Sequence, residues 1–360
     1  MSELAEGKYE PYEIPQLSQS RLEILREKIN STVWPNELEK DYDWDYGAPT
    51  WAVKPLVEKW GKNFDWNEFK EEIGQWNHYQ MKIDGLLVHY IHERSQQPDA
   101  IPIVLLHGWP STFYEFHKII KPLRDGAGRN QGFHVIVPSL PGFGFSEAPK
   151  EKGYGVTKMA SIINTLMVNL GYDKYMYHGG DWGSIIGKRM ASSHNDNCKA
   201  FHATMPLPLL SLPTLKSVIL HPFKIIKFFV SLAVGFDRVY GQGKTVLGGA
   251  TFANAERNKA CGYRAIQGTR PYTLAYGLTD SPVGMLAWIL EKYHEWTFHL
   301  PEKQNTEALP ETISSKEFLI QVSIYWLTNT ISSSIRIYYE CLNHNEMPAM
   351  FLFRTKVPVA

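Results

Sequence analysis

The sequence YMYHGGDWGSIIGKRMA, Tyr175–Ala191, decides the fold. It begins as a short apolar strand, continues through a glycine-rich turn and ends in helix-like sequence. Small residues on both sides of one central position predict a strained turn that raises a single side chain above the edge of a sheet. That position holds Asp181, so the turn presents a carboxylate where a serine nucleophile is common.

The segments around this turn repeat the strand-and-helix pattern. Helix-like sequence separates four apolar runs: IPIVLLHGWP (101–110), FHVIVPSLPGFGFS (133–146), KYMYHGG (174–180) and AFHATMPLP (200–208). Apolar strands that alternate with helices predict a parallel sheet covered on both faces, which places the chain in the α/β class. Upstream, MKIDGLLVHYI (81–91) predicts a hairpin that turns at Asp84-Gly85.

Two further regions flank this core. Within residues 1–80, AVKPLVEKW (52–60) and DWNEFKEEI (65–73) have apolar residues at helical spacing. From Leu207 to Asn345 the sequence is mostly helical and aromatic, which indicates a lid rather than more sheet. Its most apolar run, Ser217–Phe236, contains two lysines and a proline, so it predicts a buried or partly exposed helical element and not a membrane span.

Composition excludes several classes of function. Basic and acidic residues balance at 37 each, so the chain lacks the charge excess that suits nucleic acids or anionic membranes. Cys198, Cys261 and Cys341 are scattered, which fits neither a disulfide framework nor a metal site and favours a reducing compartment. The polar N-terminal sequence resembles neither a signal peptide nor an anchor. We therefore expect a cytoplasmic protein without membrane anchor, nucleic-acid partner, metal or cofactor.

Asp181 is the candidate nucleophile. Near a helix N-terminus its carboxylate is stabilised, and it can attack carbon to form an ester that water must then cleave. Asp181 could instead only cap the helix that begins at Trp182. HGWP (107–110) stands where such a fold places its second oxyanion donor, although it could be a plain turn. With both motifs in this order, we expect the backbone N–H groups of Trp109 and Trp182 to face the developing oxyanion.

These motifs resemble the microsomal type of epoxide hydrolase, which has the α/β-hydrolase fold. The similarity covers nearly the whole chain and is carried by WPNELEKDYDWDYG (34–47), LLHGWPSTFYEF (105–116), VPSLPGFGFSEAP (137–149), GGDWGS (179–184) and YWLTNTISSSIRIYYE (325–340). The first motif separates this group from shorter epoxide hydrolases and from haloalkane dehalogenases. The resemblance implies an N-terminal meander (1–80), the first part of the core (81–206), a helical lid after the sixth core strand (207–348) and the start of the second core part (349–360).

The resemblance also implies roles for individual residues. Asp181 opens the oxirane ring and becomes a hydroxyalkyl ester, while two lid tyrosines donate protons to the alkoxide. The matching tyrosines are Tyr263 and Tyr338, with Tyr339 as the neighbouring alternative to Tyr338. Trp109 and Trp182 supply the oxyanion hole, and a cis Trp109–Pro110 peptide is expected. The residues that support the elbow and loop are His107, Gly108, Pro110, Gly179, Gly180 and Gly183. The lid residues expected in the core more than in the substrate wall, although some could do both, are Trp288, Trp296 and Trp326.

Part of the family's machinery is not found in this sequence. In the family, the acid follows the next core strand after the lid, and the histidine base lies near the C-terminus. This chain ends FLFRTKVPVA (351–360), where KVPVA resembles the opening of that strand. None of the 13 histidines has the context of the base. We therefore expect the base, its acid and the last core strands to be absent, so that the ester accumulates or the sequence is a truncated form.

We predict a cofactor-independent epoxide hydrolase that converts a small apolar epoxide and water to a vicinal diol. One alternative is a haloalkane dehalogenase-like enzyme, which would need indole donors for a departing halide. Another is a catalytically incomplete relative that binds an apolar epoxide or lipid. A serine esterase is disfavoured because Ser184 lies three residues beyond the nucleophile position. The identity of the epoxide and the oligomeric state stay open.

Overall fold

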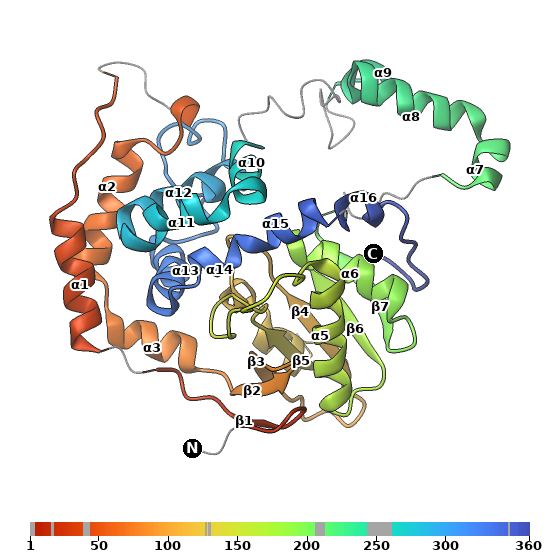
Figure 1. Ribbon diagram of the computed structural model, residues 1–360, viewed down its shortest axis with the longest axis horizontal. Helices are drawn as coiled ribbons and strands as arrows, with labels where there is room; N and C mark the ends of the chain where they lie inside the picture. Colours follow the sequence, from red (N-terminus) through yellow and green to blue (C-terminus); the bar gives the residue numbers. More distant parts are fainter. Residues whose placement is uncertain are drawn as a thin grey trace.

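The computed structural model describes residues 4–15, 18–38, 44–126, 128, 131–205, 213–242, 261–344 and 346–360. At its centre is a seven-stranded mixed sheet with helices around it (Figure 1). The strands are β1 (Tyr9–Pro11), β2 (His78–Ile83), β3 (Leu86–Glu93), β4 (Ile101–Leu106), β5 (Phe133–Pro138), β6 (Tyr175–Gly179) and β7 (Cys198–Ala203). Their order across the sheet is β1-β2-β3-β5-β4-β6-β7.

The parallel part of the sheet, β4 to β7, consists of the four apolar runs predicted from the sequence. β2 and β3 add an antiparallel hairpin, in which Asp84 and Gly85 have φ of 54° and 74°, as a type I′ turn requires. β1 pairs antiparallel with β2 at Tyr9↔Met81. The sequence does not predict β1, because a three-residue strand that ends in proline is too short to show alternation.

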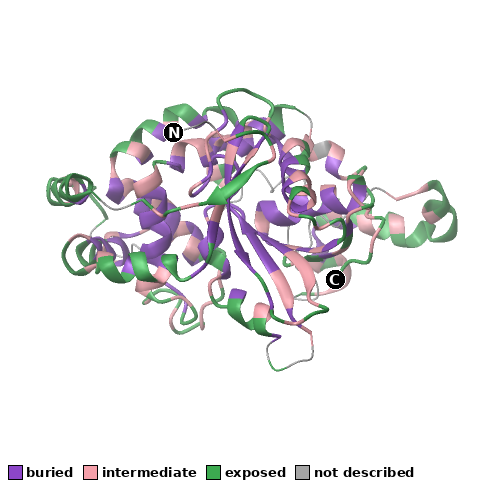
Figure 2. Cartoon of the chain, turned by 90° about the horizontal axis from the view of Figure 1, so that it is seen from below, coloured by how far each residue is buried: buried purple, intermediate pink, exposed green. Residues whose placement is uncertain are grey.

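Helices cover both faces of the sheet, because successive side chains of a strand point in opposite directions. Val104 and Leu106 of β4 pack in one buried cluster with α5 (Val156–Asn169) and α6 (Asp181–Ser193). Leu105 packs in a second cluster with η3 (Phe113–Phe116) and α4 (Ile120–Asp125). Figure 2 shows the central strands as mostly buried. The prediction of a sheet covered on both faces is confirmed.

The N-terminal segment packs against the lid. Its helices are α1 (Gln19–Asn30), η1 (Trp44–Tyr46), α2 (Thr50–Glu58), η2 (Lys59–Asn63) and α3 (Trp66–Gly74). Trp60 Nε1 donates to Ser323 Oγ at 2.9 Å, and Arg21 Nη2 donates to the Trp326 carbonyl at 3.0 Å. These contacts join segments nearly 300 residues apart in sequence, so the N-terminal segment supports the lid rather than forming a separate unit.

The described part of the predicted lid is helical and contains no strand. Its helices above the sheet are α10 (Gly262–Thr269), α11 (Pro271–Asp280), α12 (Pro282–Glu295), α13 (Ser315–Thr328), α14 (Ile331–Ser334), α15 (Arg336–Asn343) and α16 (Glu346–Met350). α13 begins with a capping box between Ser314 and Glu317, which satisfies N–H groups at its first turn. Residues 207–212, 243–260 and 345 of the lid lie outside the described residues.

Three further helices project to one side of the molecule (Figure 1). They are α7 (Leu215–Leu220), α8 (Pro222–Val234) and α9 (Phe236–Tyr240), and we call them the arm. The run Ser217–Phe236 is therefore helical as predicted, but many of its apolar side chains are exposed. Across the ranges given above, no helix has the length and apolar character needed to cross a membrane.

The last residues of the chain lie beside β7. The Phe201 N–H donates to the Pro358 carbonyl at 3.0 Å, and the Ala203 N–H donates to the Ala360 carbonyl at 2.9 Å. Phe201 and Val359 form a parallel bridge. KVPVA therefore occupies the position that the next parallel strand would take, as its resemblance implies.

Candidate active site

Asp181 stands on a sharp turn at the carboxyl end of β6. It is the first residue of α6 and has a φ of 45°, a strained conformation for a residue other than glycine. A Cβ on Gly179 would lie 2.5 Å from the Gly183 carbonyl oxygen, and one on Gly183 would lie 2.0 Å from the Leu106 carbonyl oxygen. Glycine is therefore required at both positions, because β4, β6 and α6 approach too closely for any side chain.

The HGWP loop meets Asp181 directly. The Trp109 N–H donates to Asp181 Oδ1 at 2.8 Å. A Cβ on Gly108 would lie 2.1 Å from the same oxygen, so only glycine lets the loop come this close. The Trp109–Pro110 peptide is cis, as predicted. His107 ties the loop to the core, because its Nδ1 donates to the Gly108 carbonyl at 3.0 Å and its Nε2 accepts from the Leu140 N–H at 3.1 Å.

Two opposing effects set the charge of Asp181. Burial raises the pKa of its carboxyl to about 6, while hydrogen bonds from the Trp182 and Trp109 N–H groups act to lower it. The carboxyl group is therefore mainly ionised at pH 7, in a partly dehydrated environment that makes a carboxylate more nucleophilic. The same two N–H groups are those expected to form an oxyanion hole.

The structure rejects two alternative roles at this turn. The Asp181 carboxyl accepts from the Trp109 N–H of the HGWP loop as well as from the Trp182 N–H, a contact outside the helix that capping alone does not explain. Ser184 is fully buried, and its hydroxyl donates to the Gly179 carbonyl at 2.5 Å. It therefore supports the turn and is not placed as a nucleophile.

Both predicted lid tyrosines lie over the elbow. The Tyr338 ring meets the Trp182 ring edge-on at 4.8 Å and the Tyr263 ring at 5.6 Å between centroids. Tyr263 stacks on Trp109, with centroids 5.6 Å apart and planes 7° apart. Tyr339 is only half-buried, so of the two neighbours it is Tyr338 that faces the site.

The environment of these two tyrosines keeps their hydroxyl groups protonated. Burial and the charge of Asp181 raise the pKa of Tyr263 to about 12, and the same causes raise the pKa of Tyr338 well above its usual value. The Tyr338 hydroxyl is buried and has no hydrogen-bond partner of normal geometry in the described part of the chain. Its contacts with Tyr263 and Trp182 are weak in geometry, so this hydroxyl can donate to an oxygen that enters the site.

Lys292 of α12 adds a positive charge that the sequence does not predict. Its side chain is 2% exposed and forms an ion pair with Glu291. The ammonium lies 4.9 Å from the centroid of the Tyr263 ring and 5.5 Å and 5.8 Å from those of Trp288 and Trp296. A cation over an aromatic face is attracted to it, and the attraction grows if the phenol becomes a phenolate.

A cavity of about 460 Å³ opens beside Asp181. Its lining includes Trp109, Glu115, Lys292, Tyr293, Trp296, Ile313 and Gln321. Trp296 is 41% exposed and lines this cavity, so it belongs to the substrate wall, whereas Trp326 at 7% is a core residue. Sequence reasoning did not single out Glu115, which is exposed and also lines this cavity.

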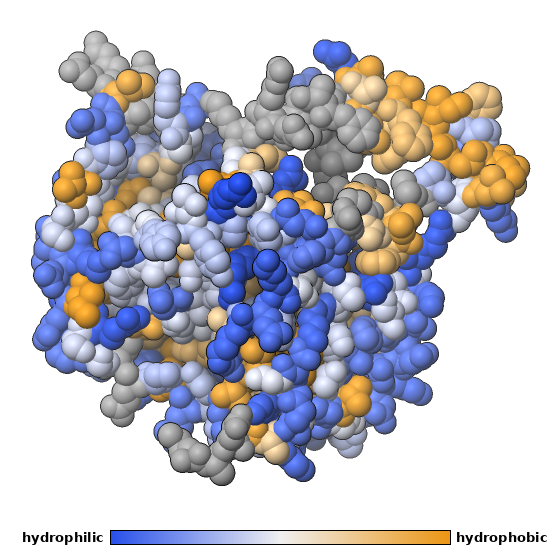
Figure 3. All heavy atoms as spheres, viewed as in Figure 1, coloured by the Kyte–Doolittle hydropathy of each residue, from blue (hydrophilic) through white to orange (hydrophobic). Residues whose placement is uncertain are grey.

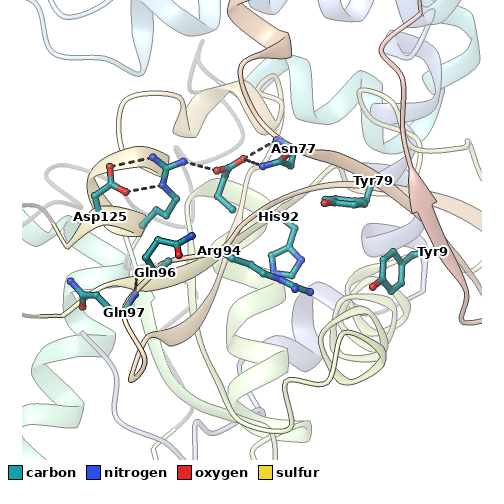
Figure 4. A pocket seen from close by; sticks show the side chains of 11 residues that line it. Tyr9, Asn77, Tyr79, His92, Arg94, Gln96, Gln97 and Asp125 are labelled. Carbon is teal, nitrogen blue, oxygen red and sulfur yellow. Dashed lines mark hydrogen bonds and ion pairs between the residues drawn. The ribbon is translucent and has the colours of Figure 1, made fainter.

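A larger cavity, of about 720 Å³, lies at the opposite edge of the sheet (Figure 4). Its charged groups satisfy one another: Arg124 pairs with Glu93 at 2.7 Å, and Glu93 accepts from the N–H and side-chain amide of Asn77 at 2.8 Å. Glu93 pairs with Val135 near the start of β5, so this cavity lies at the amino ends of the parallel strands. Open α/β sheets bind ligands at the carboxyl ends, which favours the cavity at Asp181.

One histidine lines the cavity at Asp181, and both of its ring nitrogens are occupied. His117 Nδ1 donates to the Tyr114 carbonyl at 2.8 Å, and its Nε2 lies 2.9 Å from Glu317 Oε1. His178, three residues before Asp181, points to the neighbouring strand and lies 2.7 Å from His202, nitrogen to nitrogen. Neither is arranged as a base for Asp181. In the described ranges, no group of three or more His, Cys, Asp or Glu side chains could hold a metal ion.

Comparisons with known proteins match both halves of this arrangement. Residues 9–116 match the family model described as the epoxide hydrolase N terminus. Residues 101–226 match the model of the alpha/beta hydrolase fold. The second match contains the HGWP loop, the elbow and the start of the arm.

Curated relatives align over most of the chain. A putative epoxide hydrolase of Stigmatella aurantiaca is 36% identical over 93% of this chain and 70% of its own length. Epoxide hydrolase 1 of Sus scrofa is 34% identical over 94% of this chain and 73% of its own length. Juvenile hormone epoxide hydrolase 1 of Ctenocephalides felis is 32% identical, covering 92% and 69% respectively.

Solved structures give the same result for the fold. The juvenile hormone epoxide hydrolase of the silkworm Bombyx mori superposes with a TM-score of 0.75 at 26% identity, over 98% of this chain and 79% of that one. The epoxide hydrolase of Aspergillus niger gives a TM-score of 0.73 at 26% identity, over 98% and 82%.

Proposed function

The chain belongs to the epoxide hydrolases of the α/β-hydrolase fold, and on that premise we propose that it opens an epoxide through a covalent ester of Asp181. The observation that carries this proposal is the position of the Asp181 carboxyl, on a strained turn between the Trp109 and Trp182 N–H groups and below two lid tyrosines. Because the chain belongs to the epoxide hydrolases, we no longer consider a haloalkane dehalogenase-like activity.

In the first step, a carboxylate oxygen of Asp181 attacks a ring carbon of the epoxide. The carbon–oxygen bond of the ring breaks, and the released oxygen takes a proton from a tyrosine hydroxyl. This step forms a hydroxyalkyl ester and a tyrosinate. A positioned general acid contributes typically 10²- to 10⁴-fold to such a rate. Tyr338 and Tyr263 suit this role because their raised pKa values keep them protonated.

The tyrosinate formed in this step needs a compensating charge. The buried ammonium of Lys292, 4.9 Å from the Tyr263 ring centroid, supplies one. We propose that Lys292 lowers the cost of transferring the Tyr263 proton, without touching the substrate. This role accounts for a buried lysine among three aromatic rings.

In the second step, water attacks the ester carbonyl carbon of Asp181. The resulting tetrahedral oxyanion accepts hydrogen bonds from the Trp109 and Trp182 N–H groups. Collapse of this intermediate expels the ester oxygen as an alkoxide, which takes the proton removed from water and leaves as the vicinal diol. The remaining carboxyl proton of Asp181 returns to the tyrosinate, so the overall reaction consumes one epoxide and one water. A base must take the proton from water in this step.

Both ring nitrogens of His117 are engaged, so this histidine is not free to take a proton from water. This favours a second candidate function, in which the protein performs the first step and retains the ester. In that case, the protein binds one epoxide and turns over slowly or not at all. The two candidates share Asp181 and differ only in the fate of the ester.

The substrate class follows from the cavity. Trp109, Tyr293, Trp296 and Ile313 give it apolar walls, so we propose a small apolar epoxide with an aryl or alkyl substituent. Two relatives are described as juvenile hormone epoxide hydrolases, which supports an epoxide as the substrate.

Isotope labelling tests the ester mechanism. After a single turnover in H₂¹⁸O with enzyme in excess, the proposal predicts ¹⁸O in the Asp181 side chain and unlabelled oxygen in the diol. ¹⁸O in the diol from that first turnover, with none in Asp181, would mean that water attacks the epoxide directly. That outcome would reject the covalent mechanism.

A further inference from the structure

The arm exposes a continuous apolar surface. Phe223 is 84% exposed, Leu215 78% and Ile219 67%. The other exposed apolar residues of the arm are Val218, Leu220, Ile226, Phe229, Val230 and Val234. Figure 3 shows these hydrophobic side chains gathered over the projecting helices. Large contiguous apolar patches on a protein surface mark sites that contact another apolar phase or a partner.

The apolar residues of α8 lie along one side of the helix. Phe223, Ile226 and Val230 are spaced i, i+3 and i+7, which places them in one stripe. The opposite side of α8 is used for packing within the arm: Phe228 packs against Phe236 of α9, with ring centroids 5.8 Å apart. The stripe is therefore not needed to hold the arm together.

Positive charge borders this stripe. Lys216, Lys224 and Lys227 are interspersed with the exposed apolar residues, and no Asp or Glu occurs between Thr214 and Phe236. Lys227 lies 4.4 Å from the ring centroid of Tyr240 and so is held against the arm. The chain as a whole has equal numbers of acidic and basic residues, so this run of positive charge is a local feature.

We propose that the arm docks on the surface of an anionic phospholipid bilayer. Helices with an apolar stripe and flanking lysines lie in the membrane interface, where the stripe enters the acyl boundary and the ammonium groups meet lipid phosphates. α8 has 13 residues, which is too short to span a bilayer. The arm therefore lies on the membrane and does not cross it.

The same charge pattern argues against pairing with a second copy of the chain. A two-fold interface brings the same patch of two molecules together, so the three lysines would face their own copies, with Asp237 of α9 as the one acidic residue of the arm. An anionic lipid surface satisfies both the charge and the apolar stripe. The inference stands without the proposed reaction, although an apolar epoxide dissolved in the bilayer would lie close to the enzyme.

Flotation with lipid vesicles tests the proposal on the full chain. Vesicles contain either phosphatidylcholine alone or phosphatidylcholine with about 30% phosphatidylserine. We expect flotation mainly with the anionic vesicles and a loss of binding at high salt. The variant K224Q/K227Q should bind about 25-fold more weakly, at about fivefold for each lysine. The variant F223S/I226S should bind at least tenfold more weakly, since it removes the side chains that enter the lipid.

A matched control carries the same chemical change elsewhere. Tyr276 of α11 is 82% exposed, and Tyr276→Ser should leave binding unchanged. Circular dichroism of each variant verifies folding, and light scattering measures oligomeric state. Binding that is equal for both vesicle types, or equally weakened by Tyr276→Ser, would overturn the proposal. A dimer that F223S/I226S dissociates, without vesicle binding by the parent chain, would also overturn it in favour of self-association.

Discussion

Replacing Tyr338 by Phe removes one hydroxyl group and leaves its ring contacts intact. The Tyr338 hydroxyl is buried, and its contacts with Tyr263 and Trp182 fall outside normal hydrogen-bond geometry, so its removal should change the free energy of unfolding little. The ring still packs against Trp182, whose centroid is 4.8 Å away. The effect of the substitution should therefore fall on the reaction and not on the fold.

The expected loss follows from the role of the hydroxyl. Removing one of two donors to a developing alkoxide costs about 3 kcal/mol of transition-state stabilisation, which is about 100-fold in rate. Tyr263→Phe should cost a similar factor, and the double variant should lose nearly all alkylation. Tyr339→Phe is the matched control, because it makes the same change one residue along on a side chain that does not face the site.

The assay is the rate of Asp181 alkylation in a single turnover, followed by rapid quenching and intact mass measurement. A Tyr338→Phe rate within twofold of the parent chain would refute the proton-donor role. So would a loss in Tyr339→Phe that equals the loss in Tyr338→Phe. Thermal melting of the same samples separates either result from unfolding.

Three other changes test the surroundings of the nucleophile. Because the pKa of Asp181 is raised to about 6, the alkylation rate should rise with pH through 6 and level off above 7. Ionising a carboxyl whose folded pKa lies above its usual 3.8 costs stability. Asp181→Asn should therefore stabilise the fold by about 3 kcal/mol at pH 7.5 and by less than about 1 kcal/mol at pH 4, measured by denaturant titration. Gly183→Ala puts a Cβ 2.0 Å from a backbone oxygen of β4 and should destabilise the fold by about 3 kcal/mol. The control is Gly277→Ala, whose Cβ would have nothing within 4 Å, and it should be neutral or stabilising in the same titration. Lys292→Met should slow alkylation about tenfold and leave the midpoint of the pH–rate profile unchanged. A shifted midpoint would mean that the lysine acts on Asp181 instead of on Tyr263.

Local sequence determines the elbow, and so it could be predicted. GGDWGS needs glycine where Gly179 and Gly183 touch neighbouring backbone, and HGWP needs it where Gly108 meets the carboxylate. The alternating apolar runs likewise predict β4 to β7, because a strand buried on both faces leaves a continuous apolar signal.

The residues that sequence reasoning missed depend on contacts between distant elements. Lys292 reads as an ordinary exposed lysine on a helix, and only the packing of α12 over Tyr263 buries it. Trp296 reads as core because tryptophan usually is, yet it lines the cavity. The apolar residues of the arm were expected to be at least partly buried, and their exposure depends on where α7 and α8 lie relative to the rest of the molecule.

The central claim is that Asp181 forms a covalent ester with an epoxide. Intact mass measurement of the chain after incubation with an aromatic epoxide tests it most directly, with Asp181→Asn as the control. The account predicts an added mass of one epoxide, transient or persistent, that maps to the peptide containing Asp181 and is absent from the variant. A persistent adduct would favour the second candidate function, in which the ester is retained. A transient adduct together with diol would favour complete turnover. An adduct of the same yield in Asp181→Asn, or diol formation by that variant at the parent rate, would contradict the account.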